Sequence, residues 1–169
     1  LSSFFTKFNT INNNQFGFRK GHSTELATVK FCEDVLTNFN NGHASSAILL
    51  DLSKAFDSVD RSILLHKLYK YGIRGKTHDL LKSYLSNRTQ FIQTDEVKTN
   101  IANVKVGVPQ GSVLSPLLFL LHINDLKNCT NLQIINFADD TLLYYTIKDS
   151  EIETTREILN SELNKVEDE

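Results

Sequence analysis

The sequence predicts an α+β fold with a mostly antiparallel sheet. Three patterns support this class: helical periodicity over residues 23–38, a continuous apolar run over residues 46–52, and two apolar runs over residues 132–137 and 141–147 that a tight turn joins. In chain order, the predicted elements are a helix, a strand, two helices, a hairpin, a helix, a second hairpin and a last helix.

The first predicted helix, over residues 23–38, follows a segment in which we predict no element. Its apolar residues recur every three or four positions, so we expect them to form its buried face; they are Leu26, Val29, Cys32, Val35, Leu36 and Phe39. An Asn-Asn-Gly sequence ends this helix. The run over residues 46–52 is continuously apolar up to its last residues, which predicts a central strand.

Two helices and a hairpin are predicted next. Asp60 is placed to cap the first helix, which Gly72 ends. Apolar residues within 80–85 indicate the second helix. Residues 89–94 and 101–107 are predicted to pair as a hairpin.

The last third of the chain is predicted to contain a helix, a hairpin and a final helix. Residues 112–126 read as one long apolar helix. After the second hairpin, Ser150 and Glu153 have the spacing of a capping box, in which two side chains satisfy backbone N–H groups of the first turn. We therefore predict that the last helix begins there.

Length and composition describe a globular protein. The 169 residues have room for one domain, or for one domain and part of another. With 40% hydrophobic and 22% charged residues, the chain is neither disordered nor fibrous. The net charge is only −2, so no overall basic field indicates a nucleic-acid partner. Because the chain contains no Met, we expect a piece of a longer reading frame.

Two further observations concern compartment and membrane. The most apolar stretch, residues 114–123, contains Pro116 and His122 and is about half the length that spans a bilayer, so we expect a buried helix and no membrane partner. Cys32 and Cys129 lie far apart without a recognisable spacing, which favours a reducing intracellular compartment.

Carboxylates stand at the ends of predicted strands, where an unpaired charge is costly. Asp51 follows the first apolar run, and Asp139 and Asp140 occupy the turn of the second hairpin. A divalent cation would offset that cost, as in two-metal phosphoryl-transfer centres. The alternative is that each Asp is an ordinary turn or capping residue. Because two such junctions occur in one chain, we favour the metal site.

Four sequence blocks give the chain a specific resemblance. They cover residues 15–24, 47–60, 108–117 and 137–141, and the last contains the motif Phe-Ala-Asp-Asp. In these blocks, which occur in family order and extend over nearly the whole chain, the sequence resembles the reverse transcriptase domain of a non-LTR (LINE-type, jockey-like) retrotransposon.

The resemblance implies a polymerase palm-type antiparallel sheet with packed helices, which is an incomplete reverse transcriptase fold. Residues 1–45 would form a fingers-edge segment and the helix leading into the palm, and residues 46–169 the palm with the catalytic motifs. The upstream basic block of the family would precede Leu1, and its primer grip and thumb would follow Glu169.

The implied activity is that of an RNA-directed DNA polymerase from a mobile element. Such an enzyme transfers a nucleotide from a dNTP to the 3′-hydroxyl of a DNA primer on an RNA template, by two-Mg²⁺ chemistry. The family would also place the full protein in the nucleus at some stage. Two alternatives stay open: a catalytically inactive retrotransposon remnant and an RNA-directed RNA polymerase palm.

By the same resemblance, Asp51, Asp139 and Asp140 are the catalytic residues. They would hold two Mg²⁺ ions about 3.5–4 Å apart, with the backbone carbonyl of Leu52 as a further ligand. Mn²⁺ is the expected substitute. Carboxylate and carbonyl oxygens are hard ligands, which suit Mg²⁺.

The resemblance assigns five residues to nucleotide binding. The backbone amides of Lys54 and Ala55 would face the triphosphate, and the Phe56 ring would act as a steric gate that excludes a 2′-hydroxyl. Gln110 and Gly111 would border the incoming nucleotide and the template. The alternatives are a solvated surface lysine for Lys54 and an ordinary core aromatic for Phe56.

One basic pair is assigned to nucleic acid. Arg19 and Lys20 would contact phosphates of the template or the primer. A glycine-flanked basic pair is also common on protein surfaces, and this alternative stays open.

Overall fold

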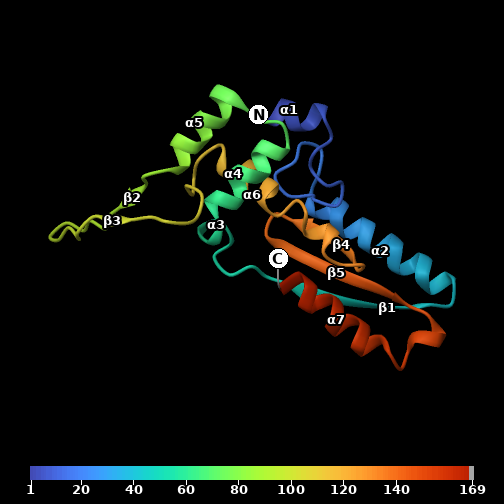
Figure 1. Cartoon of the computed structure of the whole chain (residues 1–169). Helices are drawn as coiled ribbons and strands as arrows, with labels where there is room; N and C mark the ends of the chain where they lie inside the picture. The colour runs from blue at the N-terminus through green and yellow to red at the C-terminus, as the bar shows by residue number, and fades with distance from the viewer. Residues whose placement is uncertain (168–169) are drawn as a thin grey trace. The chain divides into compact units, whose positions relative to one another are not determined.

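The computed structural model describes residues 1–167, except for the side chain of Asp149. The chain divides into two compact units (Figure 1). Unit 1 contains Leu1–Ser53 and Ile123–Glu169, and unit 2 contains Lys54–His122. Helices and antiparallel strands occur together, so the predicted α+β class is confirmed. The predicted boundary between fingers edge and palm at residues 45 and 46 stays a prediction.

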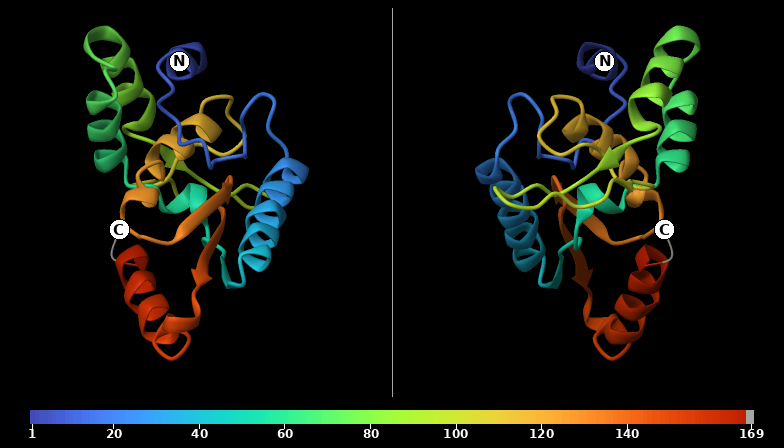
Figure 2. Two further views of the ribbon diagram at one scale, coloured as in Figure 1. Left: turned by 90° about the vertical axis from the view of Figure 1, so that its right-hand side faces the viewer. Right: turned by 90° about the vertical axis from the view of Figure 1, so that its left-hand side faces the viewer.

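Unit 1 is built around a three-stranded antiparallel sheet. Its elements are α1 (Ser2–Lys7), α2 (Thr24–Asn40), β1 (Ala44–Leu50), the 3₁₀ helix η1 (Leu126–Asn128), β4 (Gln133–Phe137), β5 (Asp140–Ile147), the 3₁₀ helix η2 (Asp149–Glu151) and α7 (Thr155–Glu167). The strand order is β1-β5-β4. Helix α2 packs on one face of this sheet and α7 on the other (Figure 2).

Alternation along β5 explains the two layers. Leu142 and Tyr144 belong to the apolar cluster on the α2 face, whereas Leu143 and Tyr145 belong to the cluster on the α7 face. Leu143 and Tyr144 are both buried. The middle strand of the sheet is therefore covered on both faces, as its nearly continuous apolar sequence indicates.

The buried face of α2 differs from the predicted one. Ala27 and Phe31 face the sheet, and the Tyr144 hydroxyl donates a hydrogen bond to Asp34 Oδ2 at 2.5 Å. The helix carries two apolar stripes, and periodicity alone does not determine which of them meets the sheet. Of the residues predicted to be buried, those exposed to solvent are Leu26, Val29, Cys32, Leu36 and Phe39.

Other boundaries in unit 1 also differ from prediction. Helix α1 was not predicted, although its Phe5 is almost fully buried. Strand β1 starts and ends two residues earlier than predicted, because β5 extends to Ile147 and pairs with Ala44. The predicted capping box is wrong: Ser150 lies inside η2, and α7 begins at Thr155, whose hydroxyl donates to the Glu151 carbonyl at 2.6 Å.

Unit 2 consists of short helices and a hairpin. Its elements are α3 (Ala55–Ser58), α4 (Arg61–Lys70), α5 (Gly75–Leu85), β2 (Thr89–Gln90), β3 (Ala102–Asn103) and α6 (Ser115–His122). The predicted cap of α4 is confirmed, because Asp60 Oδ1 accepts hydrogen bonds from the backbone N–H groups of Ser62 and Ile63 at 2.7 and 3.0 Å. The buried leucines of this unit are Leu64, Leu68, Leu81, Leu85, Leu118, Leu120 and Leu121.

Two elements of unit 2 are shorter than predicted. The hairpin pairs only over β2 and β3, with one more bridge between Gln93 and Lys98. Its apolar side chains, such as Ile92 and Ile101, are exposed, so no packing extends the ladder. Helix α6 begins only at Ser115, because Pro116 lacks an N–H group and is tolerated only in a first turn.

Among the described residues, no helix combines the length and the apolar character that a membrane crossing requires.

Candidate active site

The sheet of unit 1 brings the three predicted carboxylates to one of its ends. Leu50, the last residue of β1, pairs with Thr141 of β5. Asp51 follows Leu50 and Asp140 precedes Thr141, so the antiparallel register places Asp51 beside Asp140. Asp139 lies next to Asp140, in the turn between β4 and β5. The order of strands in the sheet therefore joins two motifs that lie far apart in the sequence.

The carboxylates are open to solvent. Asp51 and Asp140 are exposed, Asp139 is half-buried, and within residues 1–167 none of the three accepts a hydrogen bond. Their side chains do not converge as a set, because no group of three His, Cys, Asp or Glu side chains in the described part of the chain is close enough to hold a metal ion. The donor set nevertheless consists of hard oxygens, with the backbone carbonyl of Leu52 next in the chain after Asp51, and this chemistry fits Mg²⁺.

Gln15 braces the turn that carries these aspartates. Its Oε1 accepts hydrogen bonds from the N–H groups of Ala138 and Gly17 at 3.0 and 2.8 Å, and its Nε2 donates to the Ala138 carbonyl at 3.2 Å. Gln15 is only 4% exposed. Ala138 has φ = +57°, a left-handed conformation that is costly for a residue with a Cβ atom. The two hydrogen bonds to Ala138 hold that conformation directly before Asp139, and the one from Gly17 fixes the Gln15 side chain.

The segment around Gln15 lies along the edge of β4. The Phe16 N–H donates to the Asn136 carbonyl at 2.7 Å, and the Asn136 N–H donates to the Asn14 carbonyl at 2.8 Å. At Gly17, a Cβ atom would come within 2.1 Å of the Ala138 nitrogen. Only glycine permits this approach. Neither Gln15 nor Gly17 was assigned a role from the sequence, although both lie in a block that carries the family resemblance.

The predicted nucleic-acid contacts lie just beyond this segment. Arg19 Nη1 donates to the carbonyls of Asn12 and Gln15 at 2.7 and 3.0 Å, so it also holds the loop. Burial lowers the pKa of Arg19 from its ordinary value. Lys20 is exposed. A role for either residue in phosphate binding stays a prediction.

The predicted nucleotide-binding residues all belong to unit 2. Lys54 is exposed and precedes α3 in a left-handed conformation, with φ = +57°, and Ala55 is buried. The ring of Phe56 is half-buried and stacks on Phe119, with the ring centroids 4.7 Å apart. This stacking agrees with the alternative that Phe56 is an ordinary core aromatic. The steric-gate role of Phe56 stays a prediction.

The loop before α6 is joined to the Phe56 segment. The Val108 N–H donates to the Phe56 carbonyl at 2.8 Å, and Gln110 Nε2 donates to Asp57 Oδ1 at 3.3 Å. A Cβ atom on Gly107 would come within 2.9 Å of the Asp57 backbone. Gly111 has φ = +75° and open space around it. The structure thus brings the predicted Phe56 and Gln110 segments together.

Known proteins match the chain over most of its length. It is 31% identical over 155 residues to the probable RNA-directed DNA polymerase from transposon BS, and 35% identical over 136 residues to that from transposon X-element, both of Drosophila melanogaster. It is 32% identical over 135 residues to the RNA-directed DNA polymerase from mobile element jockey of the same species. These matches cover 86%, 78% and 75% of this chain.

The chain is far shorter than these relatives, because the matches span only 17%, 15% and 15% of their lengths. The family model described as reverse transcriptase (RNA-dependent DNA polymerase) matches residues 1–168. Since that match extends over all but the last residue, the chain belongs to the reverse transcriptase family.

Proposed function

We propose that the chain carries the nucleotidyl-transfer centre of an RNA-directed DNA polymerase from a non-LTR mobile element. The observation that supports this most directly is the register of β1 and β5, which sets Asp51 beside Asp140. The names of the relatives, which are RNA-directed DNA polymerases of transposons or mobile elements, support the proposed reaction and the proposed biological source.

Reverse transcriptases use divalent metal ions, and we propose Mg²⁺ here, with Mn²⁺ as a substitute. Asp51, Asp139 and Asp140 hold two such ions together with the Leu52 carbonyl. When bound, these ions supply Lewis-acid chemistry at the primer 3′-hydroxyl and at the triphosphate of the dNTP. Gln15 keeps the Asp139 backbone in place through Ala138.

Unit 2 binds the nucleotide in this proposal. The amides of Lys54 and Ala55 face the triphosphate, and Gln110 and Gly111 border the base and the template. Phe56 excludes a ribose 2′-hydroxyl, and its stacking on Phe119 supports this role, because a gate must be held by its neighbours. Arg19 and Lys20 contact phosphates of the RNA template or the DNA primer.

Primer extension on an RNA template with Mg²⁺ tests the proposal. We expect extension with dNTPs and a loss of about 100- to 1000-fold in Asp139→Asn, which is typical when one group that stabilises transition-state charge is removed. The matched control is Asp95→Asn, which makes the same change at an exposed residue of the hairpin in unit 2.

Other outcomes would point to the alternatives. Extension with rNTPs in place of dNTPs would indicate an RNA-directed RNA polymerase. If neither this chain nor the longer protein extended a primer, the chain would be a catalytically inactive remnant of a mobile element.

A further inference from the structure

The charge of the chain is divided unevenly between the two units. Unit 2 contains ten Lys and Arg residues and five Asp and Glu residues, a net charge of +5. Unit 1 contains eight Lys and Arg residues and fifteen Asp and Glu residues, a net charge of −7. The overall charge of −2 therefore conceals a basic unit. Such a unit attracts polyanions.

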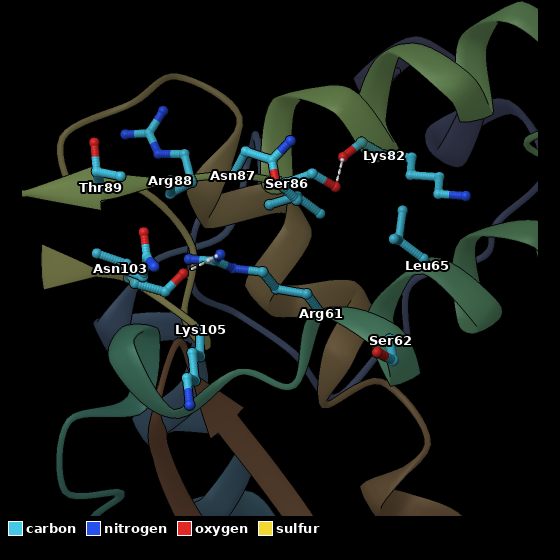
Figure 3. Close-up of a pocket in the computed structure, with 12 residues that line it drawn as sticks. Arg61, Ser62, Leu65, Lys82, Ser86, Asn87, Arg88, Thr89, Asn103 and Lys105 are labelled. Atoms are coloured by element: carbon cyan, nitrogen blue, oxygen red, sulfur yellow. Dashed lines mark hydrogen bonds between the residues drawn. The ribbon is translucent and has the colours of Figure 1, made fainter.

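A pocket of about 580 Å³ in unit 2 gathers part of this charge (Figure 3). Four cations line it: Arg61 from α4, Lys82 from α5, Arg88 from the segment after α5, and Lys105 from the segment after β3. The lining contains no Asp or Glu and no aromatic side chain. The other polar residues of the lining are Ser62, Ser86, Asn87, Thr89 and Asn103.

Arg61 forms the fixed centre of the pocket. Its Nε donates to the Gly107 carbonyl, its Nη1 to the Val104 carbonyl and its Nη2 to the Val106 carbonyl, at 2.7, 2.7 and 2.8 Å. All three acceptors are neutral carbonyl groups, so these hydrogen bonds do not neutralise the positive charge of Arg61. Burial, and then the neighbouring charge of Arg88, lower the pKa of Arg61 from its ordinary value.

The other three cations are exposed and available. Within residues 1–167, the side chains of Lys82, Arg88 and Lys105 make no hydrogen bond or ion pair. In Figure 3 their side chains extend to different sides of Arg61 rather than toward one point. This arrangement suits several phosphates along an extended chain better than one compact anion. Without an aromatic side chain, the pocket offers no platform for base stacking.

We propose that this pocket binds the phosphodiester backbone of a nucleic-acid strand, with Lys82, Arg88 and Lys105 as the contacts around Arg61. The inference rests on the proposed polymerase function, and it adds a binding surface in unit 2 to the pair Arg19 and Lys20. Binding there does not depend on base sequence, because the pocket presents charges and donors to the backbone.

Fluorescence anisotropy with short labelled strands tests this inference in EDTA and without dNTPs. The probes are a single-stranded RNA, a DNA of the same sequence and the RNA–DNA duplex. The pocket variant is Lys82→Gln/Arg88→Gln/Lys105→Gln. The control is Lys70→Gln/Arg74→Gln/Lys76→Gln, which removes the same charges from the same unit outside the pocket.

We expect the pocket variant to bind about tenfold or more weakly, and its log–log salt slope for single strands to fall by about 2 between about 50 and 200 mM salt. The control variant should lose much less. A loss confined to the RNA or to the DNA probe would support the proposal and identify the strand. Equal losses in both variants would show only diffuse attraction and would overturn the proposal, as would no loss in either.

One further variant and one combination of results separate this result from that of the polymerase test. Glu157→Gln, a change at an exposed residue of unit 1 that has no role in the proposed site, should bind all three probes about as tightly as the parent chain, since the pocket belongs to unit 2. If the parent chain extended no primer while the pocket variant alone lost binding, the catalytic proposal would fail and the binding surface would stand. If circular dichroism showed the triple variant to be unfolded, Arg88→Gln/Lys105→Gln would be compared with Arg74→Gln/Lys76→Gln.

Discussion

Gln15 acts on the aspartate turn through Ala138, 123 residues away in the sequence. In Gln15→Ala, the buried N–H groups of Ala138 and Gly17 lose their acceptor. We expect the free energy of unfolding to fall by about 1–3 kcal/mol and primer extension to fall about 10- to 100-fold, because the turn before Asp139 loosens. Urea denaturation and extension assays measure both effects. Gln133→Ala, at an exposed site on β4, is the control, and an equal loss there would contradict the bracing role.

Gly17 has a steric rather than a polar function. A methyl group at this position would meet the Ala138 nitrogen at 2.1 Å, and the next nearest atoms, in Phe137 and Ala138, are also backbone and leave little room to adjust. We expect Gly17→Ala to cost about 3 kcal/mol or more in thermal or urea unfolding. Gly21→Ala is the comparison, because Gly21 has φ = +77° but open space, so only backbone strain of about 1 kcal/mol applies. Similar losses in both variants would exclude the close approach as the cause.

Among the elements, α7 is joined to the segment before β4 by one carboxylate, in addition to its apolar contacts with the sheet. Glu162 is 7% exposed, and it accepts hydrogen bonds from Thr130 Oγ1, the Asn131 N–H, Asn131 Nδ2 and Lys165 Nζ, at 2.8, 2.6, 3.0 and 2.5 Å. The ion pair with Lys165, followed by the Asn131 N–H, lowers the pKa of Glu162 to about 2 from its ordinary 4.5. Folding therefore favours the ionised form of the Glu162 carboxyl group.

This shift predicts acid sensitivity with a definite sign. The folded state holds the carboxylate ionised, so its contribution is complete above pH 4.5 and is lost as the pH falls toward 2. We expect Glu162→Gln to lose about 1–3 kcal/mol at neutral pH and to show a flatter stability profile between those pH values. Glu157→Gln, at an exposed site on the same helix, should follow the parent profile. A parallel profile for Glu162→Gln would refute the linkage.

Helix α2 shows what a periodic pattern can and cannot predict. The helix itself was predictable from its spacing, and so was the Asp60 cap of α4, because both depend on residues close together in the sequence. Which stripe of α2 is buried depends on Tyr144 and Ile135 of a sheet more than 100 residues later. The length of α6 was overestimated because its apolar run continues beyond the turns that are helical.

Shortening single side chains to Ala tests which face of α2 is buried. Phe31 packs against the sheet and stacks edge-to-face on Tyr144, whereas Leu36 is 59% exposed. We expect Phe31→Ala to lower the free energy of unfolding by about 2 kcal/mol and Leu36→Ala to change it by less than about 0.5 kcal/mol. The reverse ranking in urea denaturation would show that the predicted face is the buried one.

At the scale of the whole molecule, the sequence predicted that Asp51, Asp139 and Asp140 follow strand ends, and their roles stay predictions; it did not predict the contacts that support the site. The motifs that contain Asp51 and Asp139 are recognisable because each combines an apolar run with a carboxylate. The brace at Gln15, the approach of Gly17 and the cations around Arg61 join distant segments, and no local spacing marks them. The basic character of unit 2 is likewise hidden in a net charge of −2 until the chain is divided by its contacts.

The proposed metal site predicts that the three carboxylates at one end of the sheet make the stability of the chain depend on metal. Without metal, Asp51, Asp139 and Asp140 repel one another, so we expect Asp139→Asn to be more stable than the parent chain by up to about 1 kcal/mol. With Mg²⁺ at about 100 times its dissociation constant, the parent chain should gain about 2.7 kcal/mol, because the ion binds only the folded state. In Mg²⁺ the parent chain should therefore be more stable than Asp139→Asn, the reverse of their order without metal.

Thermal unfolding in EDTA and in Mg²⁺ measures this reversal without any catalytic readout. Asp95→Asn should follow the parent chain in both conditions, since it lies in unit 2 on the exposed hairpin. An equal gain from Mg²⁺ in Asp139→Asn would show that the ion binds elsewhere. The repulsion without metal and the stabilisation by Mg²⁺ are both expected to arise from the same carboxylates. A variant that relieved the repulsion but kept the full stabilisation by Mg²⁺ would contradict a shared site.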